Sequence, residues 1–250
     1  MIHIPMGSWM KINVLILAAS SIEGDGSSPN YPICLHEIGD ETVLQVIMSK
    51  LAHLEDAIYS FAVLSNDIRK FHVDNIVEIL QPGSNVFSVS HKTMGSACTA
   101  LLASCRLKGD EELIIISSNE IVDVDINKVV IDFRSRKLDA GTVTFQSIHP
   151  RYSYVKLDQN GLVVEAAQQK PISHNATTGI FWFRTVDDFI CGAKKLMLKR
   201  SNTNEQYYIA PIFNELILFG KAIGAYEISN DKYTPLKSLS HLNASQIKYE

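Results

Sequence analysis

The sequence predicts an α/β domain built on a mixed, mainly parallel sheet with crossover helices. Three observations predict it. Residues 12–18 form an apolar run in which Asn13 is the one polar residue, and such a run is typical of a strand buried on both faces of a parallel sheet. Segments with strand and helix periodicity alternate through the first half of the chain. The second half adds short strand-like segments separated by turn residues, which is typical of antiparallel pairing.

The first half alternates strands and helices. Strands are expected at 12–18, 57–64, 75–80 and 112–116, and helices at 42–54, 66–72, 93–105 and 125–136. A loop of turn-forming residues at 20–30 follows the first strand. Asp125 is expected to cap the last of these helices, with Val129, Val130 and Phe133 on its inward face.

The second half has a different pattern of secondary structure, with more short strands. Strands are expected at 140–148, 152–158, 162–168, 178–184 and 222–228, and helices at 186–199 and 209–218. Asp158, Asn160 and Gly161 form a hairpin signal between two of the strands. Since no internal repeat is present, the chain is interpreted as one domain over 11–243, preceded by an N-terminal extension at 1–10.

Charge and composition exclude several classes of protein. The chain has 250 residues, 46% of them hydrophobic, and 23 Lys and Arg against 27 Asp and Glu give a net charge of −4. Because no basic block is present, neither a nucleic acid nor a membrane surface is an expected partner.

The chain is also expected to be soluble and cytoplasmic. No apolar run approaches the roughly 20 residues of a membrane span. The run at 14–20 is too short for a signal peptide. The four cysteines lack the spacing of a metal site and are interpreted as reduced thiols.

Ligands of open parallel sheets bind beyond the carboxyl ends of the strands, so the loops there are the candidate sites. The loop at 20–30 contains Gly24 and Gly26 but matches neither the dinucleotide nor the P-loop fingerprint. Its serines and backbone amides are suited to cradle a phosphate, and a plain polar loop explains them equally well. The acidic segment after residue 116 includes Asp123 and Asp125, a D-x-D pair that suggests a magnesium site. Asp125 is equally explained as a helix cap.

Several segments in the same order resemble one family, the sugar-phosphate nucleotidyltransferases. The resemblance is to the branch near glucose-1-phosphate thymidylyl- and cytidylyltransferases associated with surface polysaccharides. The segments are Leu15–Ala19, Gly95–Ala103, His149–Val155, Lys170–Ser173, Ala176–Phe183 and Tyr207–Ile217. The resemblance covers about 11–243. It implies a three-layer nucleotidyltransferase (GT-A/Rossmann-like) fold, with a nucleotide-side half at about 11–136 and a sugar-side half at about 137–243.

This resemblance implies a reaction in which a nucleoside triphosphate and a sugar 1-phosphate give a nucleotide-activated sugar and pyrophosphate. Catalysis of this kind depends on positioning and on charge stabilisation by Mg²⁺ and cationic side chains. The chain departs from the family at each of those positions. It has Ser20–Gly24 for Gly-x-Gly-x-Arg, Pro32-Ile33 for Pro-Lys, Ser117–Asn119 for Asn-Ser-Asp, Gln168-Gln169 followed by Lys170 for Glu-Lys, and Lys237–Leu239 for Gly-Thr-Pro.

The resemblance nevertheless implies a set of site residues. The nucleotide-binding candidates are Ala19, Ser20, Gly95 and Ser118, and the sugar-binding candidates are Ser153, Gln168, Thr178 and Gly179. The catalytic candidates are Asn119 and Lys170, and the metal candidates are Asn119 and Asp123.

The expected function is that of a nucleotidyltransferase-like protein with impaired or lost catalysis. Such a pseudoenzyme would have a binding or regulatory role in polysaccharide or capsule biosynthesis. Its partners would be a nucleotide, a nucleotide-sugar or a sugar phosphate, together with an active paralogue or further copies of itself. Two alternatives stay open: an active Mg²⁺-dependent enzyme that makes a nucleotide-activated sugar, and a D-x-D glycosyltransferase. Magnesium is the expected cofactor if the protein is active, and otherwise none is expected.

Overall fold

The computed structural model describes residues 11–22, 31–91 and 93–236. The expected N-terminal extension at 1–10, the loop glycines Gly24 and Gly26, and the segment Lys237–Leu239 lie outside the described residues. Within the described part of the chain, no helix combines the length and the apolar character that crossing a bilayer requires.

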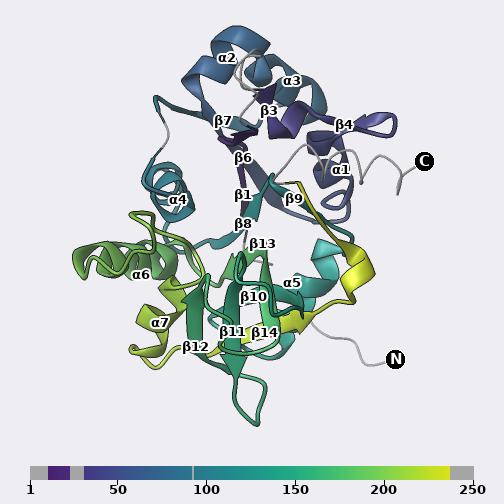
Figure 1. Ribbon diagram of the computed structural model, residues 1–250. Coiled ribbons are helices and arrows are strands. Elements are labelled where there is room, and N and C mark those ends of the chain that lie inside the picture. The colour runs from purple at the N-terminus through teal and green to yellow at the C-terminus, as the bar shows by residue number, and fades with distance from the viewer. Residues whose placement is uncertain (1–10, 23–30, 92, 237–250) are drawn as a thin grey trace.

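A mixed sheet of nine strands runs through the centre of the molecule (Figure 1). Its parallel part, in spatial order, is β7 (Asn85–Val89), β6 (Ala57–Leu64), β1 (Ile12–Leu17) and β8 (Glu112–Ser117). The long strand β13 (Asn175–Phe183) pairs antiparallel with β8 and also with β10 (Ala140–Gln146) and β11 (Ser153–Leu157). The strand β12 (Val163–Gln168) continues antiparallel from β11, and β14 (Ile223–Glu227) runs parallel to β10.

Helices cover both faces of this sheet and complete the three layers. One face carries α1 (Val43–Ser49), α2 (Ser65–Phe71), α3 (Val73–Leu80) and α5 (Ile126–Ser135), and the other carries α4 (Ser96–Ser104), α6 (Val186–Leu198) and α7 (Ile212–Ile217). In Figure 1, α4, α6 and α7 lie to the left of the sheet and α1 and α5 to the right. Successive side chains of β1 alternate between the two cores, with Val14 and Ile16 on one side and Leu15 and Leu17 on the other. The predicted α/β architecture is therefore confirmed.

One predicted strand is wrong. The segment expected to be a strand at 75–80 belongs to α3, and the strand that follows it is β7, which the sequence analysis did not predict. Val73, Ile76, Val77 and Leu80 have the i, i+3, i+4, i+7 spacing of a helix face, and Val73 and Val77 are fully buried. A short apolar run rich in β-branched residues is compatible with both the helix and the strand periodicity. Here the segment forms a helix that packs against β6.

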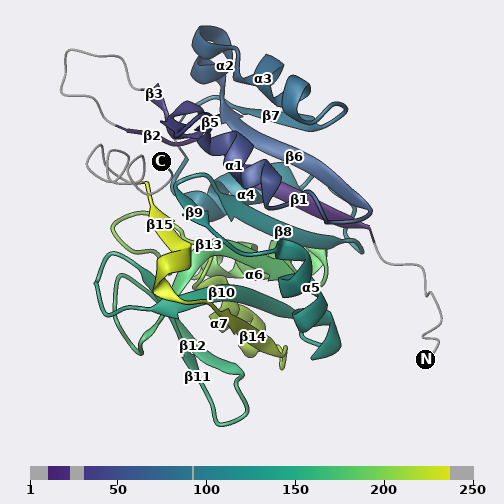
Figure 2. The ribbon, with the colours of Figure 1, turned by 90° about the vertical axis from the view of Figure 1, so that its right-hand side faces the viewer.

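The remaining predicted elements are present with shifted ends. The helices α1, α4 and α7 are shorter than expected, while Asp125 caps α5 as predicted, since its side chain accepts from the amide of Asn127 at 3.0 Å. The hairpin joining β11 and β12 is also confirmed. Figure 2 shows small pairs at one side of the sheet. They are β2 (Ser21–Ile22) with β3 (Tyr31–Pro32), β4 (Glu37–Ile38) with β5 (Glu41–Thr42), and β9 (Glu120–Val122) with β15 (Tyr233–Pro235), accompanied by short 3₁₀ helices at Ile33–Leu35 and Asn230–Lys232.

Candidate functional site

A cavity of about 400 Å³ opens at the carboxyl ends of β1 and β8, between the parallel part of the sheet and the β11–β13 region. This is the edge at which ligands of open α/β sheets bind. Eight of the eleven predicted site residues line it. They are Ala19, Ser20, Gly95, Asn119, Ser153, Gln168, Thr178 and Gly179.

Three predicted site residues lie outside this cavity. Ser118 is fully buried, and its hydroxyl donates to the carbonyl of Leu17 at 3.0 Å, which ties β8 to β1. Asp123 forms an ion pair of 2.7 Å with Lys50, the residue that follows α1. Lys170 is exposed in the segment after β12.

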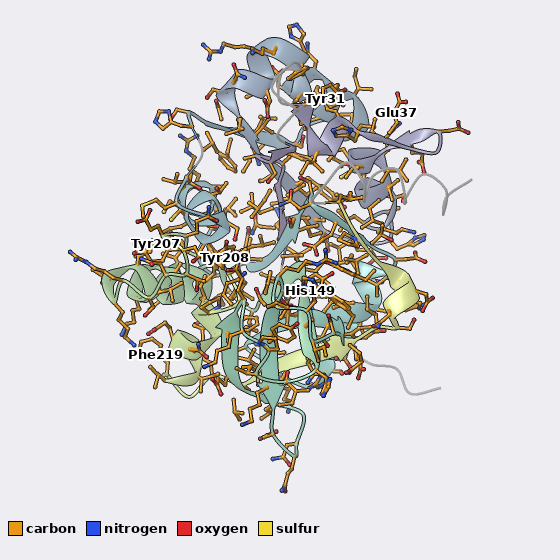
Figure 3. The ribbon with its side chains drawn as sticks, in the orientation of Figure 1. Tyr31, Glu37, His149, Tyr207, Tyr208 and Phe219 are labelled. Atoms are coloured by element: carbon orange, nitrogen blue, oxygen red, sulfur yellow. The ribbon has the colours of Figure 1, made fainter. Side chains whose placement is uncertain are left out.

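Gly95 begins the wall formed by α4. Its φ is +106°, and an added Cβ would collide with the carbonyl oxygen of Tyr207 and lie 2.8 Å from the amide nitrogen of the same residue. Two backbone hydrogen bonds join these segments: Tyr207 donates to Met94 at 2.7 Å, and Ala97 donates to Tyr207 at 3.0 Å. Tyr207 and Tyr208 lie below α4 in Figure 3. The absence of a side chain at Gly95 therefore lets this loop close over the cavity, where Tyr208 joins the lining.

The predicted sugar-side residues are paired with each other. The Ser153 hydroxyl donates to the side-chain oxygen of Gln168 across β11 and β12, so Gln168 has its amide nitrogen left for a ligand. The neighbouring Gln169 has a φ of +54° and does not line the cavity; its side-chain oxygen accepts from Asn204 at 2.8 Å. The two adjacent glutamines therefore have different environments.

The floor of the cavity is formed where β13 meets the turn between β8 and β9. At Gly179 an added Cβ would collide with Oε1 of Glu120 and lie 2.5 Å from the Cβ of Ser117. Thr178 is 2% exposed, and its hydroxyl oxygen accepts from the amide of Ile180 at 3.3 Å. Close approach of β13 to β8 therefore explains the glycine, and it brings the Glu120 carboxylate to the cavity wall.

Sequence reasoning did not select two charged lining residues, Glu120 and Arg151. Glu120 is 7% exposed, and its Oε2 accepts from the Tyr233 hydroxyl at 2.7 Å. Burial, followed by the charge of Glu120, raises the pKa of Tyr233, so the hydroxyl stays protonated and donates. The Arg151 guanidinium lies 4.8 Å from the centre of the Tyr152 ring and donates to its hydroxyl at 2.7 Å. Arg151 lies within His149–Val155, one of the segments that carry the family resemblance, so this position could have been selected as a candidate site residue from the sequence.

Asn119 occupies the position at which the resemblance implies a metal-binding carboxylate. Its side-chain Oδ1 is buried and has no hydrogen-bond partner among the described residues. Magnesium is usually held by one or two carboxylates together with substrate phosphates. Of the two predicted metal ligands, Asn119 brings no charge and Asp123 is paired with Lys50. No cluster of three His, Cys, Asp or Glu side chains suited to a metal occurs among the described residues. These residues do not fit a magnesium site built on paired carboxylates.

Comparison with known proteins identifies solved structures with a similar fold. No family model matches the chain, and no curated protein matches it. Among solved structures, the nucleoside-diphosphate-sugar pyrophosphorylase from Vibrio cholerae RC9 superposes with a TM-score of 0.76 at 18% identity, over 94% of this chain and 99% of that one. A Bacillus anthracis structure described as a glucose-1-phosphate thymidylyltransferase, in complex with a sucrose, gives 0.72 at 18% identity, over 95% of each chain.

A third structure, HddC from Yersinia pseudotuberculosis, gives a TM-score of 0.65 at 13% identity, over 95% of this chain and 99% of that one. Each match spans nearly the full length of both chains, so it concerns the whole architecture and not one motif within it. The chain therefore has the three-layer fold of these nucleotidyltransferase-like structures, as the sequence predicts.

Proposed function

We propose that this chain is a sugar-phosphate nucleotidyltransferase-like protein whose cavity binds a nucleotide-activated sugar or a sugar phosphate, with impaired nucleotidyl transfer. The observation that carries the proposal is the charge of the cavity wall. Among the lining residues that the structure describes, Arg151 is the one permanently cationic side chain. Most of the other polar groups there are neutral amides and hydroxyls, among them Gln168, Ser153 and Thr93.

A triphosphate requires much more positive charge than this wall supplies. Charge-assisted hydrogen bonds are roughly twice as strong as neutral ones, and the loss of one electrostatic stabiliser typically costs about 10²–10³ in rate. The sequence at 21–30 adds no Lys or Arg after β1. Ile33, where the family has Lys, lines the cavity with an apolar side chain. Several such losses together support weak turnover or none.

The wall suits a sugar better than a triphosphate. Neutral amides and hydroxyls exchange hydrogen bonds with sugar hydroxyls without the cost of burying an unpaired charge. One cation, Arg151, is sufficient for a monophosphate or the end of a diphosphate. We therefore propose a binding or regulatory role in the biosynthesis of a surface polysaccharide such as a capsule, beside an active paralogue or as a homo-oligomer, in the cytoplasm and without a metal cofactor.

Calorimetry tests this proposal. The purified chain is titrated with nucleoside diphosphate-sugars, sugar 1-phosphates and nucleoside triphosphates, each with and without Mg²⁺, and pyrophosphate release is measured with the same compounds. We expect a nucleotide-sugar or sugar phosphate to bind more weakly than about 10 μM, roughly −7 kcal/mol, with little dependence on Mg²⁺ and no pyrophosphate release. Micromolar triphosphate binding that requires Mg²⁺ would overturn the proposal.

The two adjacent glutamines supply a matched control. Gln168→Ala removes a group that lines the cavity, whereas Gln169→Ala removes one that faces Asn204. We expect the first substitution to weaken ligand binding about fivefold, the effect of one neutral hydrogen bond, and the second to leave it unchanged. Equal effects of the two would show that the ligand binds elsewhere.

The second candidate is an active Mg²⁺-dependent nucleotidyltransferase. The Glu120 carboxylate favours this candidate. Glu120 follows Asn119 directly and lines the same cavity, so the cavity wall does carry one carboxylate beside the expected metal position. Pyrophosphate release with any nucleotide and sugar 1-phosphate would establish this function in place of the first. A D-x-D glycosyltransferase is not proposed, because Asp123 pairs with Lys50 and Asp125 caps α5.

A further inference from the structure

The Glu120 carboxylate has an unusual environment for a buried charge. The residue is 7% exposed, and among the described residues no Lys, Arg or His nitrogen lies within 4.0 Å of its oxygens. Within the described part of the chain, its carboxylate has one hydrogen bond, the 2.7 Å bond that Oε2 accepts from the Tyr233 hydroxyl. A buried carboxylate is costly unless several donors satisfy it. Oε1 therefore has capacity for further hydrogen bonds.

The position of Oε1 shows where those donors must come from. This oxygen lies against the backbone of Gly179, and both Glu120 and Gly179 line the 400 Å³ cavity. Two of the four predicted sugar-binding residues, Ser153 and Gln168, line the same cavity with their polar side chains. An acceptor on a wall that otherwise carries hydroxyls and amides complements a ligand that offers several O–H donors.

Tyr233 holds this carboxylate in place. Its ring stacks on Phe145 with the centroids 4.0 Å apart and packs edge-on against Tyr152 at 5.7 Å. The strand β15 that carries Tyr233 pairs with β9, which begins at Glu120. Both the backbone and the ring of Tyr233 are therefore held in place, so its hydroxyl fixes Oε2 of Glu120, while Oε1 lies beside Gly179, a residue of the cavity wall.

We propose that Glu120 is a specificity-determining residue that accepts hydrogen bonds from the sugar hydroxyls of a nucleoside diphosphate-hexose, with Tyr233 as its positioning residue. This inference rests on the proposed function of the cavity. A carboxylate at this place attracts hydroxyl donors and repels phosphates, so it selects a ligand that carries its sugar over the same nucleotide without one. Among the described residues that line the cavity, Glu120 is the one Asp or Glu side chain.

Substitution and paired ligands test the inference. Wild type, Glu120→Gln and Tyr233→Phe are titrated with UDP-, dTDP-, CDP- and GDP-hexoses, glucose and mannose, and with the matching nucleoside diphosphates. Glu120→Gln keeps the shape and removes the charge. We expect it to weaken nucleotide-hexose binding about tenfold while the free nucleotide binds equally or more tightly. The ratio of nucleotide-hexose affinity to nucleoside diphosphate affinity measures this selectivity. Tyr233→Phe is expected to reduce this ratio about threefold, because the carboxylate loses its fixed orientation.

Asp123→Asn is the matched control, because it removes a neighbouring carboxylate that pairs with Lys50 outside the cavity. We expect this control to leave the ratio of the two affinities unchanged. Suppose that the wild-type chain binds a nucleotide-hexose and that Glu120→Gln leaves the affinity ratio unchanged. This result would overturn the inference and leave the proposed function standing. Binding that Mg²⁺ or Mn²⁺ strengthens in wild type and not in Glu120→Gln would make Glu120 a metal ligand and overturn the inference. Binding of none of these ligands would overturn this inference, and the proposed function with it if sugar 1-phosphates do not bind either.

Discussion

The backbones of Gly95 and Tyr207 lie so close together that no side chain fits between them. The Tyr207 segment donates to Met94 and accepts from Ala97, and the Cα of Gly95 faces the Tyr207 carbonyl oxygen. The contact joins the start of α4 to a loop more than 100 residues away, and the loop forms part of the cavity wall. A residue predicted to contact a nucleotide therefore also has a structural requirement for glycine.

Gly95→Ala should be strongly destabilising. The substitution adds a Cβ against the Tyr207 backbone and forces a non-glycine residue to a φ of +106°, which together cost about 3–5 kcal/mol. Urea unfolding followed by circular dichroism measures the change in the free energy of unfolding. Gly83→Ala is the control, because Gly83 has a φ of +78° and open space around it. Only the backbone cost of about 1–2 kcal/mol is expected there. Equal losses for the two variants would contradict the close contact.

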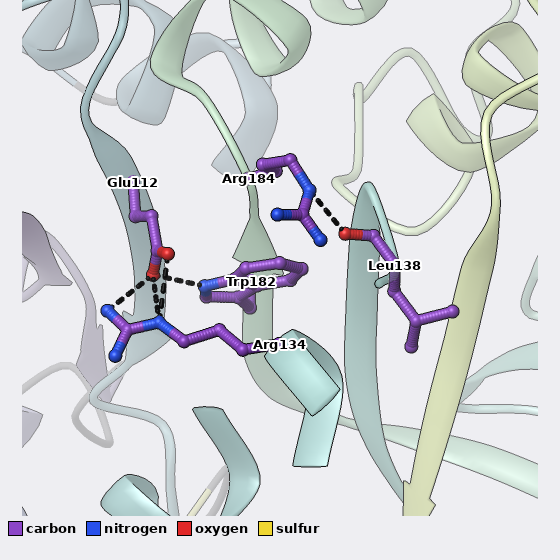
Figure 4. A network of polar contacts seen from close by, with 5 residues as sticks. All are labelled: Glu112, Arg134, Leu138, Trp182 and Arg184. Atoms are coloured by element: carbon purple, nitrogen blue, oxygen red, sulfur yellow. Dashed lines mark hydrogen bonds and ion pairs between the residues drawn. The ribbon is translucent and has the colours of Figure 1, made fainter. Parts of the chain in front are cut away.

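Arg134→Met should destabilise the sheet at the amino end of β8, opposite the cavity. Glu112 is 2% exposed and accepts from Arg134 through both carboxylate oxygens, at 2.9 and 3.0 Å, and from the Trp182 indole at 3.0 Å (Figure 4). Removing the arginine leaves a buried carboxylate without its cation, which typically costs about 3–5 kcal/mol. Thermal and urea unfolding measure the loss.

Lys128→Met is the control on the same helix. Lys128 forms a 3.8 Å ion pair with Asp125, and its side chain is 73% exposed. An exposed pair of this kind contributes about 0–1 kcal/mol, so the variant should unfold almost as wild type does. A loss below about 1 kcal/mol in Arg134→Met would show that Glu112 does not depend on this pair.

The cysteines should differ sharply in reactivity. Burial, together with the charge of Asp67, raises the pKa of the Cys34 thiol to about 12, whereas Cys105 and Cys191 are exposed. Because the thiolate is the reactive form, a thiol reagent at pH 8 should modify Cys105 and Cys191 first and Cys34 only after unfolding. Mass spectrometry of the labelled peptides identifies the sites. Rapid labelling of Cys34 in the folded protein would contradict its burial.

The same thiol makes stability depend on pH. The folded chain holds the Cys34 proton up to about pH 12, whereas the unfolded thiol releases it near pH 9. Its contribution to stability is therefore complete below about pH 9 and is lost as the pH rises toward 12. Cys34→Ala should flatten the stability curve in that window relative to wild type. Parallel curves would show that Cys34 does not cause the decline.

Asn119→Asp should create a metal-dependent site. The new carboxylate would stand beside Glu120, so without a cation the two like charges should lower the free energy of unfolding by about 1–2 kcal/mol. Magnesium should restore this loss and strengthen triphosphate binding about tenfold, because it satisfies both carboxylates and the phosphates. Thermal unfolding and calorimetry with and without Mg²⁺ measure these effects.

The control for this substitution is Asn85→Asp, which places the same charge at the exposed start of β7, at the opposite edge of the sheet. It should respond to magnesium no more than wild type does. An Asn119→Asp variant without a magnesium response would remove position 119 from the proposed phosphate side. Gln169→Lys, which would place a lysine where the family has one, should not strengthen triphosphate binding further, because Gln169 does not line the cavity.

Local sequence patterns predicted the elements whose period is unambiguous. The apolar run at 12–18 became the central strand β1, and Asp125 capped α5 where a short polar side chain precedes an amphipathic run. The segment 75–80 was predicted as a strand because its β-branched residues suit both periods, and its helical face became decisive only against β6. Likewise, the expected parallel sheet predicted that the loops after its strands form the candidate site, and β1 and β8, whose carboxyl ends border the cavity, do run parallel.

The amino-acid sequence by itself therefore determined the fold class and the edge of the sheet at which the cavity opens, because strand burial and helix periodicity are local properties of the chain. Only the tertiary structure decided which side chains form the wall. Glu120 meets Tyr233 across 113 residues, and Gly179 lies against Glu120 because β13 pairs with β8. Such contacts depend on strand register and on the packing of distant segments, which no local pattern encodes.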